Sequence, residues 1–404
     1  MKLLILSFYF PPDLSAGSFR TEALCNEIAK NYPNVYVDVL TTKPNRYPSF
    51  SKTALDEERY KNINITRFNL TSHSGSLYGQ ILAFLHFSVK VYKATHKQEY
   101  DLVFATSSRL MTASLGAFIS KKVRATLYLD IRDLFLDTLL SLYSLKAKIF
   151  LLPFLSIIEK YTFSRADKIN LVSEGFEDYV KKKYPQKDLS FFTNGIDDVF
   201  LTPFTPENIK PSGNSEPDHV TNVLYAGNIG EGQVIDKILP DLSNILGSQY
   251  KFFIIGDGSR KKKLEHLISY KGLKNIILLD PVSRDELIKL YKDADVLFLH
   301  LDNNLAFKKV LPSKIFEYAA TGKPILAGIS GYSEIFARKY INNLEVFSPC
   351  NSIAARDALK LLELSYQYRD EFVSTFSRSM IMQILAKDIF SLVDIDTYDK
   401  NNNV

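Results

Sequence analysis

The chain of 404 residues has few of the residues that build disulfide scaffolds and metal centres. It contains two cysteines, Cys25 and Cys350, which lie far apart and in no paired spacing. Its six histidines do not follow the spacing of metal ligands either. From these absences we expect no disulfide framework, no metal and no other cofactor, and a reducing, cytoplasmic setting.

Long apolar runs are also missing. No apolar stretch reaches the roughly 18–20 residues that cross a bilayer. The apolar residues 1–10 are not followed by a small-residue cleavage site, so we expect a first buried strand rather than a signal peptide. With 46% hydrophobic and 24% charged residues, the composition is typical of a globular protein, and 404 residues suit two domains.

The net charge of +5 is unevenly distributed. Residues 1–200 contain 26 Lys and Arg against 20 Asp and Glu, whereas the second half is nearly balanced. The basic first half predicts contact with an anionic partner, either phosphate groups or an acidic lipid surface. No nucleic-acid-binding motif accompanies this excess, so we do not expect nucleic acid as a partner.

Short apolar runs alternate with helical patterns through both halves of the chain, which is typical of doubly wound α/β domains with parallel sheets. Four prolines between positions 202 and 219 indicate a linker. We therefore expect an N-terminal domain over residues 1–200, a linker over 201–220 and a C-terminal domain over 221–380. A C-terminal helix and polar tail over 381–404 would return to the first domain. Ligands of such folds bind at the carboxyl ends of the strands.

Three glycine-containing turns follow predicted strands. Gly17 and Ser18 precede a helix, and the free backbone N–H groups of a helix start favour a phosphate. Residues 227–233 and 256–258 repeat the pattern in the second half. Each turn alone is compatible with an ordinary loop, but together they predict a ligand site at the strand ends.

Residues 311–328 predict a short helix that begins at Pro312, ends at Gly322 and leads into a buried strand. Glu317 is the only carboxylate in this segment. A lone carboxylate on a helix beside a strand end can hold a polyhydroxylated ligand such as a ribose. A solvated helix face is the alternative.

Six motifs in a fixed order carry a family resemblance. They are Pro11-Pro12 to Arg20, Asp130-Ile-Arg132-Asp133-Leu134, Thr193-Asn194-Gly195-Ile196-Asp197, Tyr225-Ala-Gly227-Asn-Ile-Gly230 to Gln233, Ile255-Gly-Asp-Gly258 and Pro312 to Pro324. The set resembles glycosyltransferase family 4 over roughly residues 1–395. It is most similar to the branch of O-antigen, capsule and exopolysaccharide clusters, of the fucosamine- or N-acetylaminosugar-transferase type.

The resemblance implies a GT-B fold, with two facing Rossmann-like domains and a central cleft. It also implies retaining, metal-independent transfer from a nucleoside-diphosphate sugar. By position, Glu317 matches the second glutamate of the family's Glu-x7-Glu motif, which holds the nucleotide ribose. Gly17 matches the glycine that lets the donor phosphate and sugar approach.

The chain departs from the family pattern at three positions. Asn228 and Gln233 stand where an Arg/Lys pair usually grips the diphosphate, and Lys309 replaces the first glutamate. We expect Lys309 and Lys314 to supply the missing charge. The expected donor-binding residues are Gly17, Ser18, Gly227, Asn228, Gln233, Gly256, Gly258, Val282, Ser283, Lys309, Lys314 and Glu317.

Asp130, Arg132 and Asp133 end a predicted strand of the first domain and are the expected catalytic residues. One carboxylate can orient the acceptor hydroxyl, whereas Arg132 can bind a donor or acceptor phosphate. An internal ion-pair cluster is the alternative. No second carboxylate is placed as a covalent nucleophile, so we expect front-face substitution, as the resemblance implies.

Residues 139–161 are strongly apolar and aromatic, with interspersed lysines. The pattern predicts contact with an anionic membrane surface that presents a lipid-linked acceptor. A core helix pair broken at Pro153 is the alternative.

We interpret the chain as a cytoplasmic hexosyl- or N-acetylaminosugar transferase, peripheral on the inner face of the plasma membrane. Its acceptor would be a lipid-linked glycan of O-antigen, lipopolysaccharide or capsule. A sugar-nucleotide 2-epimerase and a non-catalytic nucleotide-sugar-binding homologue are the alternatives.

Overall fold

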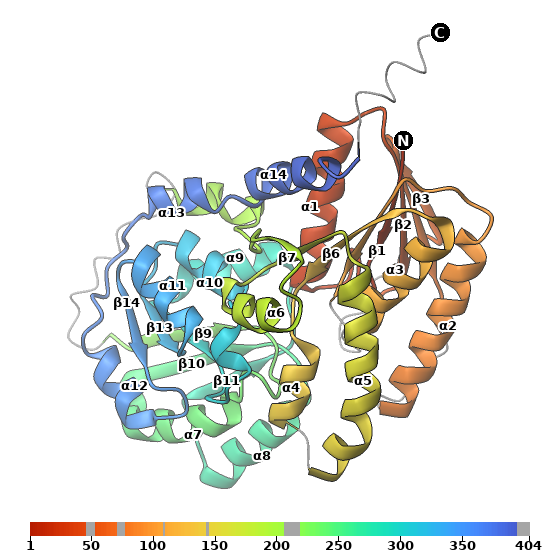
Figure 1. Ribbon diagram of the computed structural model, residues 1–404. Helices are drawn as coiled ribbons and strands as arrows, with labels where there is room; N and C mark the ends of the chain where they lie inside the picture. The colour runs from red at the N-terminus through yellow and green to blue at the C-terminus, as the bar shows by residue number, and fades with distance from the viewer. Residues whose placement is uncertain (46–52, 71–76, 108–109, 143–144, 206–218, 394–404) are drawn as a thin grey trace. The chain divides into compact units, whose positions relative to one another are not determined.

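The computed structural model describes residues 1–45, 53–70, 77–107, 110–142, 145–205 and 219–393 (Figure 1). Its contacts divide the chain into two compact units. Unit 1 consists of Met1–Asn194 with Arg378–Val404, and unit 2 of Gly195–Ser377. Most of the linker expected over residues 201–220, and most of the polar tail, lie outside the described residues.

Unit 1 is built on an eight-stranded sheet with the order β3-β4-β2-β1-β5-β6-β7-β8. All pairs are parallel except β3 with β4. The strands are β1 (Lys2–Leu6), β2 (Tyr36–Thr42), β3 (Glu57–Tyr60), β4 (Ile63–Phe68), β5 (Leu102–Thr106), β6 (Thr126–Ile131), β7 (Lys168–Leu171) and β8 (Asp188–Ser190). The central strands β1 and β5 are nearly continuous in buried apolar residues, as expected where helices cover both faces of a parallel sheet.

The α-helices of unit 1 are α1 (Ala16–Asn31), α2 (Leu77–Thr95), α3 (Leu110–Val123), α4 (Phe135–Leu142), α5 (Leu145–Arg165), α6 (Glu177–Lys183) and α14 (Arg378–Phe390). The helix break considered at Pro153 is not present, because α5 continues through this residue. A proline removes one backbone hydrogen bond from a helix, and the packing of α5 against α3 keeps the helix intact.

Helix α14 comes last in the sequence and packs against α1, the first helix (Figure 1). Asp388 of α14 accepts hydrogen bonds from the Tyr128 hydroxyl at 2.7 Å, the Lys168 ammonium at 2.6 Å and the Ser190 hydroxyl at 2.7 Å. These donors come from β6, β7 and β8, so α14 is tied to the end of the sheet of unit 1 that these three strands form.

Unit 2 contains a six-stranded sheet with the order β11-β10-β9-β12-β13-β14, and every pair is parallel. The strands are β9 (Thr221–Ala226), β10 (Tyr250–Ile255), β11 (Ile276–Leu279), β12 (Val296–His300), β13 (Ile325–Gly328) and β14 (Leu344–Phe347). The helices are α7 (Ile235–Leu246), α8 (Lys261–Lys271), α9 (Arg284–Asp293), α10 (Lys314–Ala320), α11 (Tyr332–Tyr340), α12 (Ser352–Leu359) and α13 (Asp370–Thr375).

In each unit the strand order reverses beside the first strand. The reversal lies between β1 and β5 in unit 1 and between β9 and β12 in unit 2. In doubly wound sheets, ligands bind outside the carboxyl ends of the strands at this point. The expected α/β class, with parallel sheets in two Rossmann-like domains, is confirmed.

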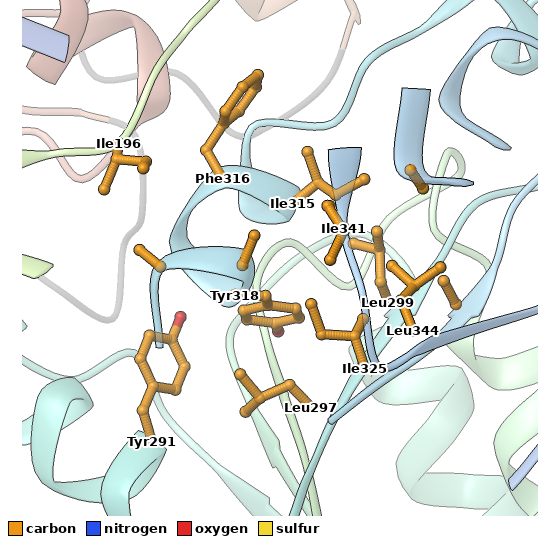
Figure 2. Packing of buried hydrophobic residues seen from close by; sticks show 14 of the residues in the cluster. Ile196, Tyr291, Leu297, Leu299, Ile315, Phe316, Tyr318, Ile325, Ile341 and Leu344 are labelled. Carbon is orange, nitrogen blue, oxygen red and sulfur yellow. The ribbon is translucent and has the colours of Figure 1, made fainter. Parts of the chain in front are cut away.

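Helix α10 is fixed by the core of unit 2 although it has only seven residues. An isolated helix of this length would not be stable in water. Its buried side chains pack with those of β12 and β13 (Figure 2). The group includes Leu297, Leu299, Ile315, Phe316, Tyr318 and Ile325. Each large apolar side chain contributes about 1.5–3 kcal/mol when fully buried, so the backbone that carries Glu317 is held rigidly.

Among the described residues, no helix combines the length and apolar character that a bilayer-spanning segment needs.

Candidate functional site

In unit 2, Glu317 lies in a polar cluster with Lys314 and Tyr291. The Lys314 ammonium donates to Glu317 Oε2 at 2.6 Å, and the Tyr291 hydroxyl donates to the same oxygen at 3.2 Å. Lys314 Nζ also lies 3.1 Å from the Tyr291 hydroxyl. Both bonds to Glu317 fall on Oε2, so within the described part of the chain Oε1 is the oxygen that can receive a ligand hydroxyl.

The phenol of Tyr291 stays protonated. Tyr291 is fully buried, and burial together with the Glu317 carboxylate raises the pKa of the phenol well above its ordinary value. Its ring meets that of Tyr318 edge to face at 5.6 Å (Figure 2). The Tyr318 hydroxyl in turn accepts the backbone N–H of Ala226 at 2.9 Å. Glu317 is therefore connected through two buried tyrosines to the end of β9.

The loops that follow β9 and β10 touch backbone to backbone. A Cβ atom at Gly256 would lie 1.9 Å from the carbonyl oxygen of Gly227, and one at Gly258 would lie 2.5 Å from that of Ile229. Only glycine allows this approach. Loop packing is therefore a sufficient reason for Gly256 and Gly258, and their contact with a donor stays a prediction.

Asn228 and Gln233 are half-buried in the loop after β9 and bind each other. The Asn228 amide donates to Gln233 Oε1 at 2.9 Å, and the Tyr225 hydroxyl donates to the carbonyl of Asn228 at 2.6 Å. The loop at the reversal of the strand order thus presents two neutral amides. They can donate N–H groups to a phosphate but supply no charge.

His300 holds the same loop, although it belongs to none of the six sequence motifs. It ends β12, is fully buried and places Nδ1 2.7 Å from the carbonyl oxygen of Gln233. The backbone N–H of Cys350 donates to Nε2 at 2.9 Å, so Nε2 accepts and Nδ1 carries the proton. Burial lowers the pKa of His300 to about 4, which keeps the ring neutral. Its place directly after a predicted strand was the available signal.

The remaining predicted donor residues lie at the same edge of the sheet. Ser283 caps α9, and its hydroxyl accepts the N–H of Glu286 at 3.3 Å. Val282 packs against the core of unit 2. Lys309 is half-buried and ends a 3-10 helix, η6 (Phe307–Lys309), in the connection from β12 to α10.

In unit 1, Asp130 belongs to a buried ion pair with Arg20 and is 1% exposed. Arg20 donates Nε and Nη2 to the two carboxylate oxygens at 3.1 and 2.9 Å, and Thr106 and Asn170 donate at 3.3 and 2.7 Å. Burial alone would raise the pKa of Asp130, but Arg20 and these hydrogen bonds hold it below its ordinary value. This geometry corresponds to the ion-pair alternative rather than to an exposed catalytic carboxylate.

Arg132, two residues after Asp130, lies beside the start of α1. A Cβ at Gly17 would lie 3.4 Å from the Arg132 guanidinium carbon. Within the described residues, Arg132 Nη1 and the Ser18 hydroxyl are buried without a hydrogen-bond partner. Burial lowers the pKa of Arg132 to about 10, so its charge remains at neutral pH. Asp133 is exposed. The structure thus brings Gly17, Ser18 and Arg132 together and buries Asp130 behind them.

Residues 207–375, which make up nearly all of unit 2, match the family of glycosyl transferases group 1. This match covers less than half of the chain and concerns unit 2. Over 119 residues it is also 31% identical to WcaI of Escherichia coli (strain K12), named as a colanic acid biosynthesis glycosyl transferase. That alignment covers 30% of this chain and 29% of the relative. The glycosyltransferase resemblance seen in the motifs is confirmed.

Solved structures resemble the chain over nearly its whole length. Sucrose-phosphate synthase from Thermosynechococcus elongatus matches with a TM-score of 0.73 at 14% identity, over 97% of this chain and 100% of the other. Anabaena HepE in complex with UDP-glucose matches with a TM-score of 0.68 at 17% identity, over 97% of this chain and 100% of the other. WaaG, a glycosyltransferase involved in lipopolysaccharide biosynthesis, matches with a TM-score of 0.60 at 14% identity, over 97% of each chain. At these identities the likeness concerns the fold, and the GT-B architecture is confirmed.

Proposed function

We propose that the chain is a retaining glycosyltransferase that moves a sugar from a nucleoside diphosphate to a lipid-linked glycan during surface-polysaccharide synthesis. The observation that carries this proposal is the cluster of Glu317, Lys314 and Tyr291 at the ligand-binding edge of the group 1 domain. A carboxylate held on one oxygen by two donors presents its other oxygen in a fixed direction, which suits a ribose hydroxyl.

The diphosphate would be bound next to this cluster. Lys314 stands three residues before Glu317 on α10, and Lys309 precedes α10 in the same connection. Lysine binds phosphate as a point charge, and the amides of Asn228 and Gln233 add neutral donors. In this arrangement the charge that develops on the leaving diphosphate is offset by lysines. One well-placed donor of this kind typically contributes about 3 kcal/mol.

Unit 1 has a candidate anion-binding group of its own. The unpartnered Nη1 of Arg132 and the Ser18 hydroxyl lie beside Gly17, which has no side chain to obstruct a phosphate or sugar. We assign Asp133 the role of orienting the acceptor hydroxyl. We assign Asp130 a positioning role, because its two oxygens are occupied by Arg20 and neighbouring donors.

The relatives support the donor and product classes. HepE has been solved with UDP-glucose, which favours a nucleotide sugar as the donor here. The names of WcaI and WaaG refer to colanic acid and lipopolysaccharide biosynthesis, which favours a growing surface glycan as the acceptor. Such a glycan on a lipid carrier would place the enzyme at the inner face of the plasma membrane.

A thermal-shift panel of UDP, GDP, ADP and CMP tests the ribose site. A nucleotide at about a hundred times its dissociation constant adds roughly 2.7 kcal/mol of stability, which raises Tm by a few degrees in a chain of this size. We expect one diphosphate to stabilise the wild type but not Glu317→Gln. The matched control is Glu334→Gln, since Glu334 forms an exposed i,i+4 pair with Arg338 on α11.

Stabilisation of wild type and Glu317→Gln to the same extent would contradict the ribose assignment. Turnover then separates the enzyme classes. Transfer to an added glycan acceptor supports the proposal. Epimerisation of the nucleotide sugar without acceptor would instead identify a 2-epimerase, and binding without any turnover would identify a non-catalytic homologue.

A further inference from the structure

Helix α2 is apolar on both of its sides. Its inner side is buried on the sheet of unit 1 through Phe84, Phe87 and Val91. Its outer side exposes Ile81 at 50%, Leu85 at 53% and Val89 at 53%, with one helical turn between successive members. The outer side of a surface helix is ordinarily polar, so a helix that is hydrophobic all round indicates a further apolar environment.

Helices α3 and α5 extend this surface. In unit 1, α3 packs against both α2 and α5 and lies between them (Figure 1). The rings of Tyr92 on α2 and Phe118 on α3 are 6.1 Å apart, and the Tyr161 hydroxyl on α5 donates to the carbonyl of Ala117 at 3.5 Å. We define the apolar face as the exposed side chains Ile81, Leu85, Val89, Phe118, Phe154 and Ile157.

The exposed charges on the described parts of the three helices that carry the apolar face are of one sign. Helices α2 and α3 contain no Asp or Glu, and α5 contains only Glu159. Glu159 is buried and bound by the Lys183 ammonium and the Tyr179 hydroxyl, both at 3.0 Å. Where the side chains of these helices are described, the exposed charged ones are basic: Lys93, Lys121, Lys122 and Lys160.

We propose that the apolar face docks unit 1 on an anionic lipid bilayer. The apolar side chains would enter the boundary between headgroups and acyl chains, and the lysines would contact lipid phosphates. The charge pattern disfavours a second copy of the chain as the occupant, because a two-fold contact would bring the same lysines against each other. The sequence pattern predicted membrane contact at residues 139–161, whereas the apolar face is centred on α2 and α3.

The position of the apolar face in unit 1 agrees with a lipid-linked acceptor. In this respect the inference rests on the proposed function. Helices α2 and α3 follow β4 and β5 directly, so they begin at the carboxyl edge of the sheet. Gly17 and Arg132 follow β1 and β6 at this same edge. A bilayer on the apolar face would therefore present a lipid-linked sugar close to these residues.

The test is sedimentation with vesicles in the absence of any sugar nucleotide. Wild type is expected to bind phosphatidylcholine vesicles that contain about a third phosphatidylglycerol, and to bind pure phosphatidylcholine at least about tenfold more weakly. The variant Ile81→Ser/Leu85→Ser/Val89→Ser is expected to lose at least roughly tenfold in binding. The matched control is Ile335→Ser/Ile353→Ser/Leu361→Ser, which removes side chains of unit 2 that are 65%, 57% and 70% exposed.

A second variant, Lys121→Gln/Lys122→Gln, keeps the apolar side chains and should weaken binding roughly tenfold or more at low salt. Equal binding of the wild type and both α2 and α3 variants would overturn the proposal, as would no binding by the folded wild type. A wild-type dimer in light scattering that the α2 variant converts to a monomer would also overturn it. Because binding is measured without donor, failure here leaves the nucleotide-dependent thermal shift, and thus the proposed function, unaffected.

Discussion

Single residues in unit 1 divide into those that hold the site and those that face it. Asp130→Asn is expected to lower the free energy of unfolding by about 3–5 kcal/mol, because it leaves the buried Arg20 guanidinium without its carboxylate. Asp133→Asn, at an exposed neighbouring position, should change stability by about 0.5 kcal/mol or less and abolish most transfer. Urea unfolding and acceptor-dependent turnover of both variants check this. Full turnover by Asp133→Asn would remove it from the catalytic role.

His300 makes the stability of unit 2 dependent on pH. Burial lowers its pKa from 6.5 to about 4, so between these values the unfolded chain binds a proton that the folded chain does not. Stability should therefore rise with pH through this window, by about 3 kcal/mol in total. His300→Gln should remove this slope in urea titrations at several pH values. An unchanged slope in the variant would show that another group is responsible.

Part of the residue-level site was predictable and part was not. Lys314 and Glu317 stand three positions apart, so a predicted helix already places them together. Tyr291, the third member of the cluster, lies 26 positions away and reaches Glu317 only through the tertiary fold. Likewise, the partner of Asp130 lies 110 positions earlier in the chain, and no local pattern indicates that the carboxylate is already occupied.

At the scale of elements, Arg369 ties the end of α10 to the two loops beside it. It is buried, and its guanidinium donates to the carbonyls of Ala319 at the end of α10, of Lys323, and of Asn342. Burial lowers the pKa of Arg369 to about 10, so it remains a cation that is bound by backbone carbonyls. Arg369 is thus a positioning residue for the helix that carries Glu317.

Arg369→Lys is expected to weaken nucleotide binding about tenfold or more, since hydrogen bonds from a charged group each contribute about 1.5–3 kcal/mol. The turnover number at saturating donor should change much less, because Arg369 is buried and its guanidinium is bound by backbone carbonyls. Donor KM and kcat measured separately check this split. The control is Arg356→Lys on α12, whose guanidinium pairs with Asp357 at the surface. A loss of kcat with an unchanged KM would contradict the positioning role.

The alternation of strands and helices was predictable at this scale because strand and helix periodicities differ. Which side of α2 is exposed was not predictable, because periodicity does not show which side of an all-apolar helix packs against the sheet. The continuation of α5 through Pro153 was also not predictable, since it depends on packing against α3.

At the scale of the whole molecule, the motif order and the doubly wound pattern were enough to predict two Rossmann-like units and a glycosyltransferase resemblance. The glycine-containing turns after predicted strands placed the candidate site at the carboxyl ends of the strands. The strand order, and with it the point of reversal, depends on pairing between distant segments and was not predictable. The network of Asp388 with Tyr128, Lys168 and Ser190 could not be predicted. It joins residues up to 260 positions apart.

The tie between α14 and unit 1 has a consequence for biosynthesis. Unit 2 is continuous in the chain and its two ends run side by side, since Ile196 pairs with Ser377 and donates its N–H to the carbonyl of Phe376 at 2.7 Å. A nascent chain can therefore complete unit 2 while unit 1, although begun first, still lacks its last helix. Until α14 leaves the ribosome, the surface of α1 that it covers stays open to chaperones. Any message truncated before α14 yields a polypeptide in which the unit made first is the one left unfinished.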